Sequence, residues 1–348
     1  MQQDNWMTYI KVPTEKSEAI PEIRSPRNGD IHVDIDIIDR CNLQCPTCWR
    51  GVAALPNTSE LMPLARFQEI VNKIHAEGYP NLALINWTEP FLCTTLHEYI
   101  PAIRETGMDS WLSSNLSLSP KEYLHSIIRT LEAGVDILFV SVSGFTQEIY
   151  EINHKLGKVD WIRTNLEGIA QEMRAGRIKT SVWVRYLEFP YNSHEKQPWA
   201  EFCKSLGIGF NAVPAHGDPR IPLPSEKTFN QHVEDRLQQT ESQITPEQNP
   251  IPQKVCSLIA DRVAIDAKGD VYLCCAYPNS ERLRIGAYVD LDEHELLLRR
   301  HEHPFCTSCT IDARRDLNSK DQDRFRKARE QRLSQSEASI SLTKRKPT

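Results

Sequence analysis

The sequence predicts an α/β protein: a partial, TIM-like barrel of parallel strands, followed by a small cysteine-rich domain. Three features of the chain support this prediction. Strand-like and helix-like segments alternate six times over residues 31–218, three cysteines follow the first strand closely, and four more cysteines gather within residues 255–318. Strands that alternate with helices at this spacing are typical of parallel βαβ units, which close or partly close into a barrel.

The six predicted strands carry apolar and β-branched residues. In IHVDIDII, residues 31–38, apolar and polar residues alternate, which is the signature of a strand with one buried face. The other five strand-like runs are LALINW (82–87), SWLSS (110–114), DILFVSV (136–142), SVWVRYL (181–187) and GIGFNAV (207–213).

Helix-like stretches separate these strands. The first covers about 63–77, where Pro63 suits the first turn, an apolar stripe runs from Phe67 to Ile74, and Gly78 is the expected stop. Four more are expected at 96–106, 120–133, 160–174 and 195–205.

The barrel is flanked by segments of different composition. Residues 1–30 are polar and contain three prolines, which indicates an irregular arm, and residues 219–254 are rich in Pro, Gln, Glu and Ser, which indicates a linker. Residues 319–348 hold nine Lys or Arg against four Asp or Glu. We interpret them as a basic tail, helical in its first half and disordered at its end, which is solvated or, alternatively, contacts an acidic partner.

Composition excludes several classes of protein. Of 348 residues, 40% are apolar and 25% charged, no apolar run is long enough to span a membrane, and the N-terminus lacks the pattern of a secretory signal. We therefore expect a cytoplasmic protein with no membrane partner, in which ten cysteines indicate metal binding or catalysis rather than disulfides. The net charge of −6 argues against nucleic acid as the main partner.

The first cysteine set is Cys41, Cys45 and Cys48, directly after the first strand. Three thiolates would satisfy three irons of a four-iron cluster and leave the fourth iron open to a small molecule. A closed zinc site is the alternative, but it needs a fourth protein ligand and no histidine is close in the sequence.

This CxxxCxxC loop resembles the signature of the radical S-adenosylmethionine (radical SAM) superfamily, and the resemblance covers about residues 31–215. It implies a partial (β/α)6 barrel and a [4Fe–4S] cluster whose open iron binds the amino and carboxylate groups of SAM. Reductive cleavage of SAM then gives a 5′-deoxyadenosyl radical that abstracts hydrogen from a C–H bond, with a flavodoxin- or ferredoxin-type protein as electron donor. The residue before the third cysteine is usually aromatic in the family; here it is Thr47, and Trp49 is the candidate to pack on the adenine.

Other candidates to bind SAM stand at the predicted carboxyl ends of strands, where parallel barrels collect their chemistry. The segment Thr88-Glu89-Pro90 looks like the family's Gly-Gly-Glu-Pro segment, which holds the SAM ammonium; alternatively, Glu89 caps the next helix. The remaining candidates are Ser113, Asn115, Ser141 and Ser143 for the SAM carboxylate or ribose, Arg185 for the carboxylate, and Val213 beside the adenine. His216 is a possible substrate contact or a solvated loop residue.

The second cysteine set is Cys256, Cys274, Cys306 and Cys309. A turn at residues 266–270 predicts a hairpin that brings Cys256 and Cys274 together, and the residues alone leave zinc and iron–sulfur equally open. The pattern Cys–x12–Gly–x4–Cys, followed by CxxC, resembles the C-terminal extension of SPASM and twitch radical SAM enzymes. That resemblance implies one auxiliary [4Fe–4S] cluster.

Three cysteines remain outside the two sets. Cys203 is expected to be a buried apolar residue of a helix. Cys93 and Cys275 are candidates to donate a hydrogen atom to a substrate radical, and Cys275 is also an alternative ligand.

Three functions compete on this sequence. The first is a two-electron oxidation of a small or sugar-like molecule, in which the auxiliary cluster accepts the second electron. The second is epimerisation or cross-linking of a ribosomal peptide; the 30 residues before the first strand are too few for a winged-helix leader-binding domain. The third is a non-catalytic iron–sulfur or zinc protein, which would need no pocket around Glu89 and Arg185.

Overall fold

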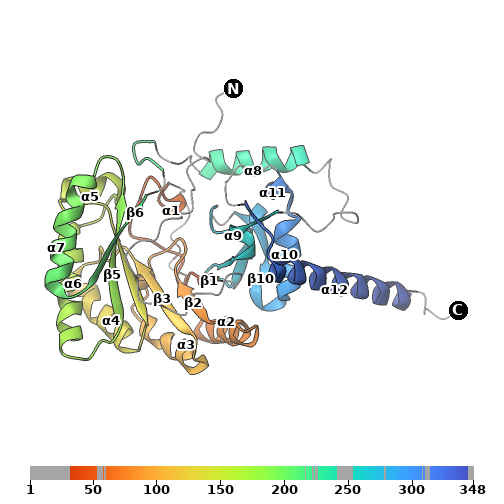
Figure 1. Cartoon of the computed structure of the whole chain (residues 1–348), viewed down its shortest axis with the longest axis horizontal. Coiled ribbons are helices and arrows are strands. Elements are labelled where there is room, and N and C mark those ends of the chain that lie inside the picture. The colour runs from red at the N-terminus through yellow and green to blue at the C-terminus, as the bar shows by residue number, and fades with distance from the viewer. Residues whose placement is uncertain are drawn as a thin grey trace.

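The structure is a computed structural model, shown in Figure 1. It describes residues 32–52, 58, 60–215, 217–221, 223, 226–240, 254–277, 280–307, 309 and 314–343. The predicted N-terminal arm, residues 1–30, and His216 lie outside the described residues. Among the described residues, no helix combines the length and apolar character needed to cross a bilayer.

Six neighbouring parallel strands form most of the main sheet, which confirms the predicted α/β fold (Figure 1). They are β1 (His32–Ile35), β2 (Asn81–Leu84), β3 (Asp109–Ser114), β4 (Ile137–Val142), β5 (Ser181–Glu188) and β6 (Gly209–Pro214). Each strand pairs in parallel with the next along the chain. The carboxyl ends of all six therefore meet at one edge of the sheet.

Helices lie between successive strands, close to the predicted ranges. They are α2 (Leu64–Ala76), α3 (Ile100–Thr106), α4 (Pro120–Glu132), α6 (Val159–Arg174) and α7 (Lys196–Leu206). In α2 the predicted stripe is fully buried, and the chain turns at Gly78, whose φ of 82° suits a residue without Cβ. The predicted helix at 96–106 is divided into a 3₁₀ turn, η3 (Leu96–Glu98), and α3, because Pro101 has no N–H for a continuous helix and favours a first turn.

The two faces of the sheet differ in chemistry. On β5, Val182, Val184 and Tyr186 are buried in the core shared with the helices. The opposite face, called the inner face below, carries a more polar set that the strand register places side by side: Asp34, Trp111, Ser113, Phe139, Ser141, Arg185 and Asn211. An inner face of this kind can receive polar ligands.

Three strands of the cysteine-rich part extend the main sheet. Strand β8 (Arg262–Ile265) pairs in parallel with β1, and β9 (Asp270–Tyr272) and β10 (Arg284–Ala287) continue the same nine-stranded sheet by antiparallel pairing. A second, two-stranded sheet joins β7 (Lys254–Cys256) to β11 (Arg314–Asp316). The short helices of this part are α9 (Ser257–Ala260), α10 (Glu293–His301) and α11 (Pro304–Thr307).

The predicted linker contains a helix, α8 (Glu226–Thr240), and this corrects the prediction. Phe229 and Val233, one turn apart, are buried in a second core with Tyr277 and Phe305 of the cysteine-rich part. The weak apolar pattern of residues 219–254 concealed this helix because only one narrow stripe of it is buried.

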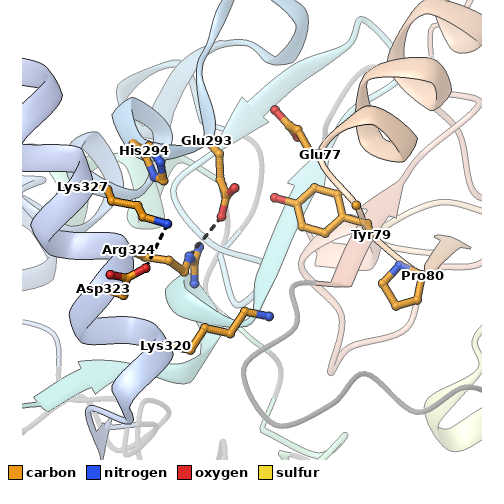
Figure 2. Close-up of a pocket in the computed structure, with 10 residues that line it drawn as sticks. Glu77, Tyr79, Pro80, Glu293, His294, Lys320, Asp323, Arg324 and Lys327 are labelled. Carbon is orange, nitrogen blue, oxygen red and sulfur yellow. Dashed lines mark hydrogen bonds and ion pairs between the residues drawn. The ribbon is translucent and has the colours of Figure 1, made fainter.

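The helix predicted in the first half of the basic tail is confirmed, but α12 (Ser319–Thr343) extends well beyond that half. Phe325 and Ala328 of its first half are buried in the second core. Figure 2 shows that Arg324 of α12 pairs with Glu293 of α10 beside a cavity that Tyr79 lines from the opposite side. The first half of the tail is thus a packed element rather than a solvated one.

Candidate functional site

The loop that carries Cys41, Cys45 and Cys48 lies at the carboxyl edge of the sheet, after β1. It is tightly folded: the amide of Cys48 donates to the carbonyl of Cys45 at 3.1 Å, and helix α1 (Trp49–Val52) starts at once. A Cβ added to Gly51 would lie 2.3 Å from the carbonyl oxygen of Cys45, so only glycine permits this approach. Cys45 and Cys48 thereby lie in one compact turn, and Cys41 precedes it in the same loop.

Hydrogen bonds to the ends of a helix and of a strand hold this loop. Thr47 Oγ1 donates to Asn153 Oδ1 at 2.7 Å, at the end of helix α5 (Gln147–Asn153), which the sequence analysis did not predict. Asn115, at the end of β3, donates through Nδ2 to Asn42 Oδ1 at 3.0 Å and lies 3.9 Å from Cys41 Sγ. The predicted candidate Asn115 is therefore beside the cysteine loop.

The three thiols share an environment that disfavours the thiolate. Burial raises the pKa of Cys41 to about 12 and also raises the pKa values of Cys45 and Cys48. The Cys48 thiol further raises the pKa values of Cys41 and Cys45. Thiolates would form here beside a strong positive charge, which metal ions provide.

The donor set fits the cluster that the resemblance implied, because three thiols from one loop leave one iron of four without a protein ligand. Among the described residues, no group of three or more His, Cys, Asp or Glu surrounds a position for a single metal ion. Ligation by these cysteines stays a prediction.

Glu89 has a definite structural role. Its carboxylate accepts from the amide of Phe91 at 3.2 Å, which confirms that it caps the 3₁₀ helix η2 (Pro90–Leu92). It also accepts from Ser114 Oγ and from the amide of Asn115, both at 2.8 Å. All three donors are neutral, and burial raises the pKa of Glu89 to about 7. A cation beside this carboxylate would favour its charged form, as the predicted contact to an ammonium requires.

A second buried carboxylate, which the sequence analysis missed, fixes the neighbouring residues. Asp36 accepts from Thr88 Oγ1 at 2.5 Å and from the amide of Trp87 at 3.2 Å. Burial raises the pKa of Asp36 to about 7. Its position in the alternating segment after β1 was the only signal for it. Thr88 is thus oriented by Asp36, and Pro90 is buried at the start of η2.

The side chains of two predicted SAM-binding residues, Ser143 and Trp49, are buried against other parts of the protein. The Ser143 hydroxyl is fully buried and lies 2.6 Å from His154 Nδ1, so it is not presented to a ligand. The Trp49 indole is buried in the second core, 4.8 Å from the Phe229 ring, and its Nε1 donates to the carbonyl of Ala276. The indole ring of Trp49 therefore packs within the cysteine-rich part and is not available to pack on the adenine.

The other candidates lie on or near the inner face. The register aligns Ser113 with Phe139, Ser141 with Arg185, and Val213 with Leu187. The guanidinium of Arg185 lies 4.1 Å from the centre of the Phe139 ring. Phe139 is two residues nearer to the amino end of β4 than Ser141, the register partner of Arg185, so Arg185 extends away from the edge that holds the cysteine loop.

The second cysteine set is gathered by several elements. The predicted hairpin exists between β8 and β9, but Cys256 lies on β7, which pairs with β11, so paired strands do not bring Cys256 and Cys274 together. The thiols of Cys256 and Cys306 nevertheless interact electrostatically with Cys274. Burial raises the pKa values of all three, that of Cys306 to about 12.

Arg300 lies in the middle of this set. It is 1% exposed and donates to the carbonyls of Leu273 (2.8 Å), Ile259 (2.9 Å) and Leu258 (3.0 Å). Its positive charge interacts with the nearby cysteines, while the Tyr277 hydroxyl lies 3.9 Å from Cys309 Sγ. The site thus combines four thiols with two buried cations, Arg300 and Arg236, whose charges both act on Cys306.

The three remaining cysteines differ in surroundings. Cys203 is fully buried in α7, as predicted. Cys93 is 2% exposed within the main core, with Sγ 3.6 Å from Thr95 Oγ1, and this burial separates it from a substrate. Cys275 is partly exposed and interacts with Arg262 and Asp34, which places it near the inner face.

No protein-family model matches the sequence, and the search of curated proteins found no match. Solved structures of SuiB from Streptococcus suis are similar to this chain. The structure of SuiB bound to S-adenosylmethionine has a TM-score of 0.54 and 15% identity, over 81% of this chain and 71% of that chain. The structure bound to the precursor peptide SuiA has a TM-score of 0.56 and 14% identity, over 84% and 68%. This likeness shows a shared fold, the one that the resemblance to radical SAM enzymes implied.

Proposed function

We propose that this chain is a cytoplasmic radical SAM enzyme. The observation that carries the proposal is the loop with the compact turn that Gly51 permits, which carries Cys41, Cys45 and Cys48 at the carboxyl edge of a parallel sheet. The three cysteines would hold a [4Fe–4S] cluster. When bound, the cluster and SAM supply a 5′-deoxyadenosyl radical that abstracts hydrogen from a substrate.

The residues around the turn would bind and orient SAM. Glu89 offers a carboxylate for the ammonium group, held in place by three hydrogen bonds, and Asn115 links this carboxylate to the cysteine loop. Thr88, Ser113, Ser141 and Val213 would complete the SAM contacts. The inner face, walled by Trp111 and Phe139, would exclude water from the reacting groups.

The second cysteine set would hold an auxiliary [4Fe–4S] cluster of the twitch type. Its four thiols come from Cys256, Cys274, Cys306 and Cys309, and the buried Arg300 would offset part of their negative charge. An electron acceptor at this place supports a two-electron oxidation of a small or sugar-like substrate. The first electron would arrive from a flavodoxin- or ferredoxin-type donor.

Radical modification of a peptide is the second candidate. The fold is shared with SuiB, whose structure has been solved with its precursor peptide bound. If the reaction is an epimerisation, Cys275 would be the hydrogen donor, because it is partly exposed near the inner face whereas Cys93 is buried in the core.

Iron and sulfide content, with EPR of the reduced protein, tests the proposal after anaerobic reconstitution. The variants are Cys41/Cys45/Cys48→Ala and, as a matched control, Cys203→Ala. We expect two clusters in the wild type and the control, and one cluster in the triple variant. SAM should change the EPR spectrum of the wild type but not that of the triple variant. Equal iron content and equal SAM response in wild type and triple variant would refute the assignment.

A further inference from the structure

The guanidinium of Arg185 lies on the inner face beside an aromatic ring. Arg185 extends from β5, partly buried, with its guanidinium over the Phe139 ring at 4.1 Å. Within the described residues, its Nε has no hydrogen-bond partner and its guanidinium forms no ion pair. An aromatic face offsets part of the cost of removing a guanidinium from water, but a carboxylate partner is the usual solution.

A second arginine reaches the same region from another strand. Arg262 belongs to β8, and its Nη1 lies 3.3 Å from Asp34 Oδ2. Its side chain is 45% exposed, so it remains accessible while Asp34 is buried. Burial lowers the pKa of Arg185, and the positive charge of Arg262 lowers it further.

Two neutral polar groups of the inner face also lack partners among the described residues. Among the described residues, Trp111 Nε1 and Asn211 Oδ1 are buried without a hydrogen bond. Asn211 stands beside Arg185 in the register of β5 and β6, and Trp111 lies on β3 one strand from Phe139. Buried polar atoms without partners are rare in proteins, and a cluster of them indicates a ligand that supplies the missing bonds.

The charges of this region indicate the chemistry of that ligand. Arg185 and Arg262 carry two positive charges and Asp34 one negative charge, while Asp261, which also acts on Arg262, is paired with Arg315, so one positive charge is left to neutralise. A carboxylate supplies one negative charge and matches the planar fork of a guanidinium, whereas a phosphate monoester would bring nearly two.

Building on the proposed function, we infer that the inner face binds its substrate through a carboxylate group, held by Arg185 with Arg262 beside it. Arg185 is thus a residue that determines substrate specificity rather than a SAM contact, because its guanidinium extends away from the cysteine loop. The carboxylate belongs either to a small acid or to an acidic side chain of a peptide.

Calorimetric titration of the reconstituted protein with SAM present tests this inference. The small-molecule probes are N-acetylglutamate and its neutral amide analogue N-acetylglutamine; the peptide probes are acetyl-Ala-Glu-Ala-amide and acetyl-Ala-Gln-Ala-amide. We expect the acid of at least one pair to bind about tenfold more tightly than its amide, as one charge-assisted contact allows. The pair that shows the preference identifies the source of the carboxylate.

Variants assign the preference to residues. Arg185→Gln should abolish it and leave the affinity for SAM unchanged, and Arg262→Gln, at a half-exposed position, should reduce it. Asp34→Asn should strengthen acid binding by releasing Arg262, an effect opposite to that of structural damage. The matched control is Arg177→Gln, on the surface beside Glu172, which should behave as wild type.

Three outcomes would overturn the inference: no preference for either acid in the wild type, a preference that survives Arg185→Gln, or a loss of SAM affinity in Arg185→Gln. Cluster content and SAM cleavage are measured on the same samples. A wild type without a SAM-dependent cluster would refute the proposed function, whereas an intact cluster without acid preference would refute only the carboxylate site.

Discussion

Replacing Glu89 with glutamine separates its two proposed roles, as a cap of η2 and as the partner of an ammonium. The substitution keeps the size of the side chain and removes its ionisation. In the wild type the carboxylate is 1% exposed and accepts hydrogen bonds from Phe91, Ser114 and Asn115. The glutamine carbonyl can replace only part of these bonds. We therefore expect Glu89→Gln to lower the free energy of unfolding by an amount that does not depend on pH, and to remove the pH dependence that Glu89 contributes.

The size of the pH effect follows from the pKa. Burial raises the pKa of Glu89 from 4.5 to about 7. The folded-state pKa of Glu89 lies above its unfolded-state pKa. The contribution of protonated Glu89 to the free energy of unfolding is therefore fully present below pH 4.5 and is lost as the pH rises through about 7. Each pKa unit corresponds to about 1.36 kcal/mol, which gives about 3.4 kcal/mol in total, of which about 2 kcal/mol is lost between about pH 5.5 and pH 8.

Urea denaturation of the cluster-free protein at several pH values measures this loss. The free energy of unfolding of the wild type should fall by about 2 kcal/mol more than that of Glu89→Gln over this interval. Asp34 and Asp36 also titrate here, but they are present in both proteins and cancel in the difference. Parallel curves for the two proteins would refute the assignment of a raised pKa to Glu89.

The proposed contact between Glu89 and the SAM ammonium is tested with SAM and the reconstituted protein. An ammonium beside Glu89 stabilises the carboxylate and lowers its pKa, so SAM should protect the wild type more at pH 7.5 than at pH 5.5. Glu89→Gln should lack this difference. Equal pH dependence of SAM protection in both proteins would leave Glu89 with the capping role alone.

Three further predictions concern the cysteine sites. Cys41→Ala should abolish SAM cleavage, whereas Cys306→Ala should retain some cleavage without product; equal cleavage in wild type and Cys41→Ala would contradict the central proposal. Gly51→Ala should lower iron incorporation at the first site several-fold, because its Cβ would lie 2.3 Å from a backbone oxygen, and iron analysis of the variant measures this. Arg300→Met should destabilise the protein by about 3 kcal/mol in urea denaturation, since three carbonyls lose a buried donor; unchanged stability would show that water replaces the guanidinium.

Much of the barrel could be predicted because its signals are local. The apolar stripe from Phe67 to Ile74 has the period of a helix, and the alternation in SVWVRYL has the period of a strand. Both elements lie within two residues of their predicted bounds. Glu89 was also located correctly at a strand end, since parallel strands collect their polar residues there.

The corrections concern residues whose role depends on distant partners. Trp49 follows the third cysteine directly, yet its position is set by Phe229 and Ala276, about two hundred residues away. Cys256 was expected on a hairpin with Cys274, but its strand pairs with β11 instead. No pattern within a short window reports such pairings, so sequence reasoning could name these residues without placing them.

The continuity of the sheet gives the cysteine-rich part a role at the inner face. Strand β8 joins β1 in register from Arg262 to Ile265, and Arg262, the register partner of His32, also pairs with Asp34 of the barrel. The same strand leads through β9 to Cys274, so one short segment contributes both to the inner face and to the second cysteine set. An appended domain could move without changing the barrel, whereas a displacement of this segment would alter both sites at once. The proposed substrate carboxylate and the proposed auxiliary cluster are therefore coupled through β8 and β9.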